Sequence, residues 1–256
     1  MRSSCDIILF MLEKLEKKIG RYAVKNLIYY ILGAYAIGYI LYLAKPEWYS
    51  YIVLDPELVM KGQVWRLFTW VCSIPQALNF FIIFMFLFYF FIGRTLEQYM
   101  GAFRYNLYIF AGWLFTTLGI MIAYWITYAI NGPGGAWVLT ANTYYINLTS
   151  FLAFAVIFPE TKVYLFAIIP VKMKILAWID VAYLGIQVIS GLVLTFASDQ
   201  TIFNALISFY GTTPSGADVK FIRYTGISTV ISILISVLNF FIFFMATAKS
   251  RNDSRK

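Results

Sequence analysis

Five long stretches without Asp, Glu, Lys or Arg dominate this 256-residue sequence, at residues 26–44, 67–93, 105–159, 181–198 and 224–248. A helix crosses a bilayer with about 20 apolar residues, so the longest stretch has room for two. The turn signal Asn131-Gly132-Pro133-Gly134-Gly135 separates those two. The pattern predicts an all-α polytopic membrane protein. Its six transmembrane helices are expected near residues 26–44, 78–98, 105–128, 138–158, 175–197 and 223–246. No strand is expected, because no segment alternates with a period of two.

Composition supports the same class of protein. Hydrophobic residues make up 61% of the chain and charged residues 12%, whereas a soluble domain has about 25% charged residues. Soluble globular, disordered and nucleic-acid-binding classes are therefore excluded. The chain contains no His and only two cysteines, Cys5 and Cys72. The commonest general base and metal ligand is thus missing, and we expect no metal site, no cofactor and no disulfide framework.

The basic residues indicate an orientation. With the N-terminus in the cytoplasm, 15 of the 20 Lys and Arg residues lie on the inside. The inside segments then carry a net charge of +8 and the outside segments a net charge of 0. This is the positive-inside bias of membrane proteins. It predicts that both termini are cytoplasmic, and it explains the positive charge by the lipid bilayer rather than by nucleic acid.

The first 25 residues have the pattern of a short amphipathic helix. Ile8, Leu12, Leu15, Ile19 and Tyr22 recur at helical spacing, and the lysines lie largely off that face. We expect this helix to lie on the cytoplasmic membrane surface; the alternative is a disordered basic tail. The chain is accordingly divided into an N-terminal segment (1–25), a membrane domain (26–248) and a short basic tail (249–256).

The segment between the first two expected spans, residues 45–77, is too long for a passive connection, which usually has two to eight residues. It contains Trp48, Trp65 and Trp70 with several Tyr and Pro residues. Aromatic side chains of this kind favour the membrane interface. We therefore expect the loop to be partly embedded in the outer leaflet. Its centre is the sequence GQVWRLFT at residues 62–69.

GQVWRLFT resembles the Trp-Arg motif in the first loop of rhomboid-fold proteins, the intramembrane proteases and the related Derlins. The sequence from Gly93 to Arg104 resembles the end of that family's second helix, and AFAVIFP at residues 153–159 resembles the end of its fourth. The matching residues are Gly62, Gln63, Trp65, Arg66, Gly93, Glu97, Gly101 and Arg104. The resemblance implies a six-helix rhomboid-like bundle in which Arg66 holds the loop through hydrogen bonds and Glu97 braces the second helix. The alternatives are an interface anchor with a snorkelling Arg and a solvated Glu.

Active rhomboids use a Ser in a G-x-S-G motif on helix 4, a His on helix 6, and a His and an Asn on helix 2. The corresponding residues here are Asn142, Thr143, Tyr144 and Tyr145, with Tyr144 at the nucleophile position. On helix 6 the His position falls on Arg223, and on helix 2 the positions are Phe81 and Met85, or Asn79 and Ile83 in another register. Without any His the Ser-His dyad cannot form, so the resemblance implies an inactive, pseudoprotease or Derlin-like member. A Ser-Lys hydrolase is an alternative, although no expected span contains Lys.

Two features concern packing and charge within the spans. Small residues at Gly226, Ser228, Ser232 and Ser236 would allow close helix contact, and the alternative is that these serines face lipid. The resemblance implies that this contact is with helix 4. Asp180 lies within the expected span 175–197, and we expect it to be an interfacial or capping carboxylate.

The expected function is that of a catalytically inactive rhomboid-like protein. Such a protein would bind transmembrane segments or membrane-protein partners and affect their folding, assembly or turnover. The alternative is a small transporter or channel, which normally keeps ionisable residues within its spans. Derlins carry a longer cytoplasmic tail, whereas eight residues follow Ala248 here. We therefore expect a bacterial inner membrane first and the endoplasmic reticulum second.

Overall fold

A computed structural model describes residues 4–77, 79–131, 141, 143–165, 169–210 and 216–253. The elements up to the second long helix are α1 (Ser4–Ile19), η1 (Gly20–Tyr22), α2 (Leu27–Ala44), α3 (Pro46–Ile52), α4 (Pro56–Met60), α5 (Arg66–Thr69), η2 (Trp70–Cys72) and α6 (Ile82–Met100). The remaining elements are α7 (Ala102–Asn131), α8 (Tyr144–Ile157), β1 (Lys162–Leu165), β2 (Ile169–Lys172), α9 (Met173–Phe196), α10 (Asp199–Tyr210) and α11 (Gly216–Asp253).

Five described helices, α2, α6, α7, α9 and α11, are long and apolar enough to cross a membrane. These correspond to five of the six expected spans. The sixth, α8, has 14 residues and is therefore about 21 Å long at 1.5 Å per residue, less than the roughly 30 Å of hydrocarbon. The Gly132–Gly135 turn, Asn142 and the first residues of the expected 138–158 span lie outside the described residues. So do the last three residues of the basic tail, whose earlier part continues α11 to Asp253.

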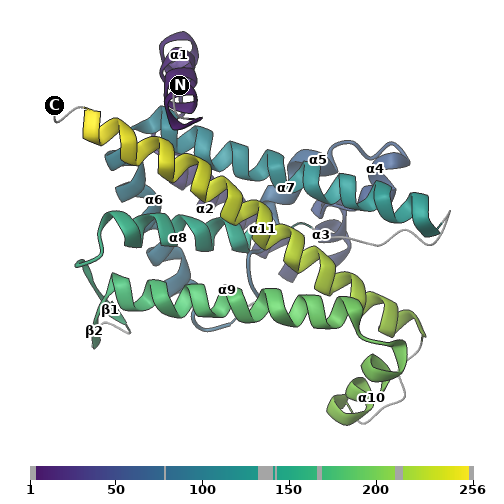
Figure 1. Ribbon diagram of the computed structural model, residues 1–256. Coiled ribbons are helices and arrows are strands. Elements are labelled where there is room, and N and C mark those ends of the chain that lie inside the picture. Colours follow the sequence, from purple (N-terminus) through teal and green to yellow (C-terminus); the bar gives the residue numbers. More distant parts are fainter. Residues whose placement is uncertain are drawn as a thin grey trace.

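The short helix α8 is the most buried part of the bundle. Its residues from Thr149 to Ala155 are all buried, and α8 packs against α6, α7, α9 and α11. Helix α11 runs diagonally across the bundle and contacts α7, α8 and α9 (Figure 1). The expected helical bundle is therefore present, with α8 enclosed by its neighbours.

Two connections contain elements that were not expected: one has strands and the other has a helix. An antiparallel hairpin of β1 and β2 joins α8 to α9, with Lys162 opposite Lys172. Glu160 accepts from the Nζ atoms of Lys172 and Lys174, each at 2.7 Å. The prediction of no strands was wrong because these strands have four residues each, too few to show a period of two. Helix α10, between α9 and α11, was also not predicted.

Helix α1 is crosswise to the long helices and contacts α11 (Figure 1). Glu16 of α1 accepts from Arg104 Nε at 3.1 Å, which ties α1 to the start of α7. Leu15, Ile19 and Tyr22 remain exposed. A crosswise helix with exposed apolar side chains has the geometry of an interfacial helix; its position on the cytoplasmic surface stays a prediction.

Candidate functional site

The first loop is organised around the C-terminal end of α3. The last carbonyls of a helix lack intrahelical partners. Here three side chains from the 62–69 motif donate to them, over four consecutive residues of the chain. Arg66 Nη1 donates to the carbonyl oxygens of Ser50 at 2.6 Å and Val53 at 2.7 Å. Trp65 Nε1 donates to Tyr51 at 3.2 Å, and Thr69 Oγ1 donates to Ile52 at 3.0 Å.

The motif's other residues place Arg66 for this role. Gln63 Oε1 accepts from Arg66 Nε at 2.7 Å, which fixes the plane of the guanidinium. Gly62 has a φ of +100°, in the region that favours Gly, and it turns the chain between α4 and α5. Arg66 is only 3% exposed, and its positive charge stands at the negative end of a helix dipole. Trp65 by contrast is 46% exposed, so its ring is available to the surroundings of the loop.

The loop is also anchored in the bundle, through residues that sequence analysis did not single out for this role. Trp70 is 1% exposed, and its Nε1 donates to Thr117 Oγ1 of α7 at 2.9 Å. Tyr39 Oη of α2 donates to the carbonyl oxygen of Gln76 at 2.8 Å. The backbone of α2 at Gly38 lies directly against the carbonyl of Cys72, where any Cβ would collide. These contacts make the loop part of the folded membrane domain.

The second group of motif residues joins α6 to α2 and α7. The carboxylate of Glu97 accepts from the backbone N–H groups of Asn26 at 2.5 Å and Leu27 at 3.0 Å. It therefore caps the N-terminal end of α2, where a negative charge is favourable. A Cβ at Gly93 would lie 2.6 Å from Ile28 Cδ1, so Gly permits the close approach of these helices. Gly101 ends α6 with a φ of +85°.

Polar side chains in the first half of α8 tie this helix to its neighbours. Asn147 Nδ2 donates to Tyr35 Oη of α2 at 2.9 Å, and Tyr108 Oη of α7 donates to Thr149 Oγ1 at 3.1 Å. The ring of Tyr144 packs edge-on against Tyr183 of α9, with centroids 6.4 Å apart. Tyrosine rings thus occupy the first turn of α8.

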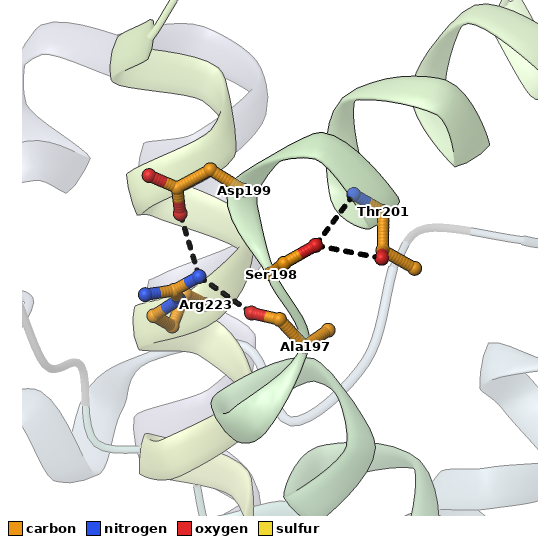
Figure 2. Close-up of polar contacts among 5 residues, drawn as sticks. All are labelled: Ala197, Ser198, Asp199, Thr201 and Arg223. Carbon is orange, nitrogen blue, oxygen red and sulfur yellow. Dashed lines mark hydrogen bonds and ion pairs between the residues drawn. The ribbon is translucent and has the colours of Figure 1, made fainter.

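The other residues that the rhomboid resemblance aligned with catalytic positions have separate contacts. Arg223 Nη2 donates to the carbonyl oxygen of Ala197 and to Asp199 Oδ1, each at 2.6 Å (Figure 2). It thereby fastens α11 to the connection between α9 and α10. Met85 is buried in α6, and Phe81 is 49% exposed beside Phe80. Arg223 and Tyr144 thus contact different parts of the chain: Arg223 contacts the connection between α9 and α10, and Tyr144 contacts Tyr183 within α9.

The small residues of α11 lie in helix contacts. Ser228, Ser232 and Ser236 are all buried, so the alternative that they face lipid was wrong. At Gly226 a Cβ would lie 2.8 Å from the carbonyl oxygen of Gly191. The closest approach of α11 at Gly226 is therefore to α9 and not to α8 as the resemblance implied, because a second Gly stands on α9.

Asp180 does not cap α9, which contradicts one of its two expected roles; the expected interfacial position stays a prediction. It is the eighth residue of α9, beyond the first turn where a cap would stand. The side chain is 6% exposed, and its Oδ2 atom is buried without a hydrogen-bond partner. Sequence analysis missed this burial because only the packing of α9 determines which face is enclosed.

The described residues contain no group of three or more His, Cys, Asp or Glu side chains that could hold a metal ion. The fold and its apolar helices define an integral membrane protein built as a helical bundle. Residues 25–212 match the family described as "Eukaryotic integral membrane protein (DUF1751)", and the chain belongs to that family. No curated protein and no solved structure matches the chain. Because the family is described as eukaryotic, the expected bacterial inner membrane is unsupported.

Proposed function

We propose that this chain is a catalytically inactive rhomboid-like membrane protein. It binds transmembrane segments or membrane-protein partners and affects their folding, assembly or turnover. The observation that carries the proposal is that the loop motif is complete and hydrogen-bonded, while the whole sequence contains no His. The resemblance places Tyr144 at the position of the nucleophile. Tyr144 has a phenol in place of the Ser hydroxyl, and the sequence has no His that could act as its base.

The surface of the bundle supports lateral binding within the membrane. Helices α6 and α9 both pack on α8, and each presents large apolar side chains outward. Leu87 of α6 is 61% exposed and Ile186 of α9 is 65% exposed. A transmembrane helix associates with such surfaces through packing and interhelical hydrogen bonds.

In-membrane crosslinking tests this proposal. A photoreactive amino acid at Leu87 or Ile186 is expected to capture specific membrane proteins. A matched probe at Ile122 of α7, which is 58% exposed, controls for random collisions. Equal capture at all three positions would show that α6 and α9 form no binding surface.

The purified protein in lipid is also expected to show no cleavage of rhomboid substrates and no labelling by a fluorophosphonate. Labelling that disappears when one Ser is replaced would overturn the inactive assignment.

We further propose that the protein resides in the endoplasmic reticulum membrane with both termini in the cytoplasm. Reporter fusions at the two ends are expected to give cytoplasmic signals, and a lumenal signal at either end would contradict this topology.

A small transporter or channel is the second candidate. It is favoured by buried oxygen atoms without hydrogen-bond partners on Asp180, Ser236 and Asn239, because polar groups within spans can line a path. Ion or solute flux into liposomes that contain the protein would support this candidate.

A further inference from the structure

Asp180 is a buried carboxylate on the candidate membrane-spanning helix α9, and the described residues give it no hydrogen-bond or ion-pair partner. It lies seven residues after Met173, the first residue of α9, which places it about 10 Å into that helix. The residue is 6% exposed, and Oδ2 has no hydrogen-bond donor within reach. Charged side chains inside a bilayer are costly and normally pair with one another or face a functional path.

Several other charged side chains in and beside the described spans have partners. Glu97 binds the N-terminal end of α2, Arg104 binds Glu16, and Arg223 binds Asp199. The remaining cation in the described part of α6, Arg94, lies beside the ring of Phe90. None of the ion pairs found in the described residues includes Asp180. Within the described residues, the carboxylate of Asp180 therefore has no counter-charge.

We propose that Asp180 binds the basic side chain of a partner transmembrane helix. This inference rests on the proposed function and names the class of segment bound: one with a Lys or Arg about seven residues inside the cytoplasmic end of its span. A basic side chain at that depth, like Asp180, loses the hydration of its charge. Pairing the two opposite charges offsets the free-energy cost of burying each of them.

The residues near Asp180 on α9 suit such a partner. Ile179 and Ile186 are 60% and 65% exposed, and they provide an apolar surface on either side along the helix. Tyr183, one turn beyond Asp180, is 38% exposed and packs against Tyr144. The face of an aromatic ring attracts a cation. The Tyr183 hydroxyl already accepts a hydrogen bond from Gln187 Nε2 at 2.6 Å, so the ring is what Tyr183 offers to a basic side chain.

The experiment uses the full chain in liposomes with a photoreactive amino acid at Ile186. The probes are leucine-rich transmembrane peptides that differ at one position, seven residues from the inner end. That position carries Lys, Leu or Glu, and a fourth peptide carries Lys at the centre of the span. We expect crosslinking of the first Lys peptide to exceed that of the Leu and Glu peptides at least tenfold.

Asp180→Asn keeps the size of the side chain and removes its charge. This variant is expected to crosslink the Lys and Leu peptides equally. Glu13 is an exposed acid on α1, so Glu13→Gln is the matched control and is expected to keep the preference for the Lys peptide. If the wild type crosslinks all four peptides equally, the inference is overturned while the proposed binding of transmembrane segments stands. If neither this probe nor a second one at Leu87 captures any of the peptides, the proposed function itself fails.

Thermal unfolding of the same variants gives a second measurement. Because Asp180 lacks an internal partner, Asp180→Asn is expected to leave the melting temperature unchanged or to raise it. A clear decrease would mean that the carboxylate is satisfied within the chain, and this result would also overturn the inference.

Discussion

Replacing Arg66 by Ala tests the role of the first loop. The substitution removes the donors for the carbonyls of Ser50 and Val53 and for the Gln63 side chain. A hydrogen bond to a charged group contributes about 1.5–3 kcal/mol. Since both carbonyls share one nitrogen atom, we expect a loss of about 3 kcal/mol in all rather than the full sum. For a chain of this size, that corresponds to a decrease of roughly 6–12 °C in melting temperature.

The assay is thermal unfolding in detergent together with limited proteolysis of the segment between Lys45 and Ala77. Arg66→Ala is expected to speed cleavage in this segment and to leave membrane insertion intact, because the apolar runs of α2 and α6 are unchanged. Lys61→Ala is the matched control, since its ion pair with Glu57 lies in solvent, and no measurable effect is expected. The reasoning is refuted if both variants behave alike in both measurements.

Three further predictions concern helix contacts and pH. Gly226→Leu is expected to lower the free energy of unfolding by about 1–3 kcal/mol, because the larger side chain overpacks against Gly191. Gly185 has open space around it, so Gly185→Leu is the control. Equal melting temperatures for the two variants would contradict the close contact at Gly226. Glu97→Ala removes the cap of α2 and is expected to cost about 1 kcal/mol in thermal unfolding; an unchanged melting temperature would contradict that role. Hydrogen bonds from two lysines lower the pKa of Glu160 to about 2, so its ion pairs stabilise the hairpin fully above the ordinary pKa of 4.5 and are lost as the pH falls towards 2. Amide exchange in β1 and β2 is expected to accelerate over that range, and Glu160→Gln is expected to abolish this dependence.

Much of the bundle could be predicted from the sequence because lipid imposes long apolar runs. The charge-free stretch at 26–44 corresponds closely to α2, which spans Leu27–Ala44. The capping of α3 by Arg66 could be anticipated only through the family resemblance, since its partners lie 13 and 16 residues earlier in the chain. The hydrogen bond from Trp70 to Thr117 could not be predicted for the same reason, because the two residues are 47 positions apart in the sequence. Such pairings depend on how helices are placed in space, and no local pattern encodes them.

Arg66, Glu97 and Asp180 are three buried or partly buried charged side chains whose contacts differ in kind. Arg66 and Glu97 each satisfy backbone groups at a helix end, so the fold itself explains their presence in or beside the membrane. Asp180 satisfies no such group, yet it stands 6% exposed on the enclosed side of α9. An apolar residue at that position would pack without the cost of burying a carboxylate. Architecture therefore accounts for Arg66 and Glu97 but not for Asp180, and the reason that we propose for Asp180 is a basic side chain on a bound helix.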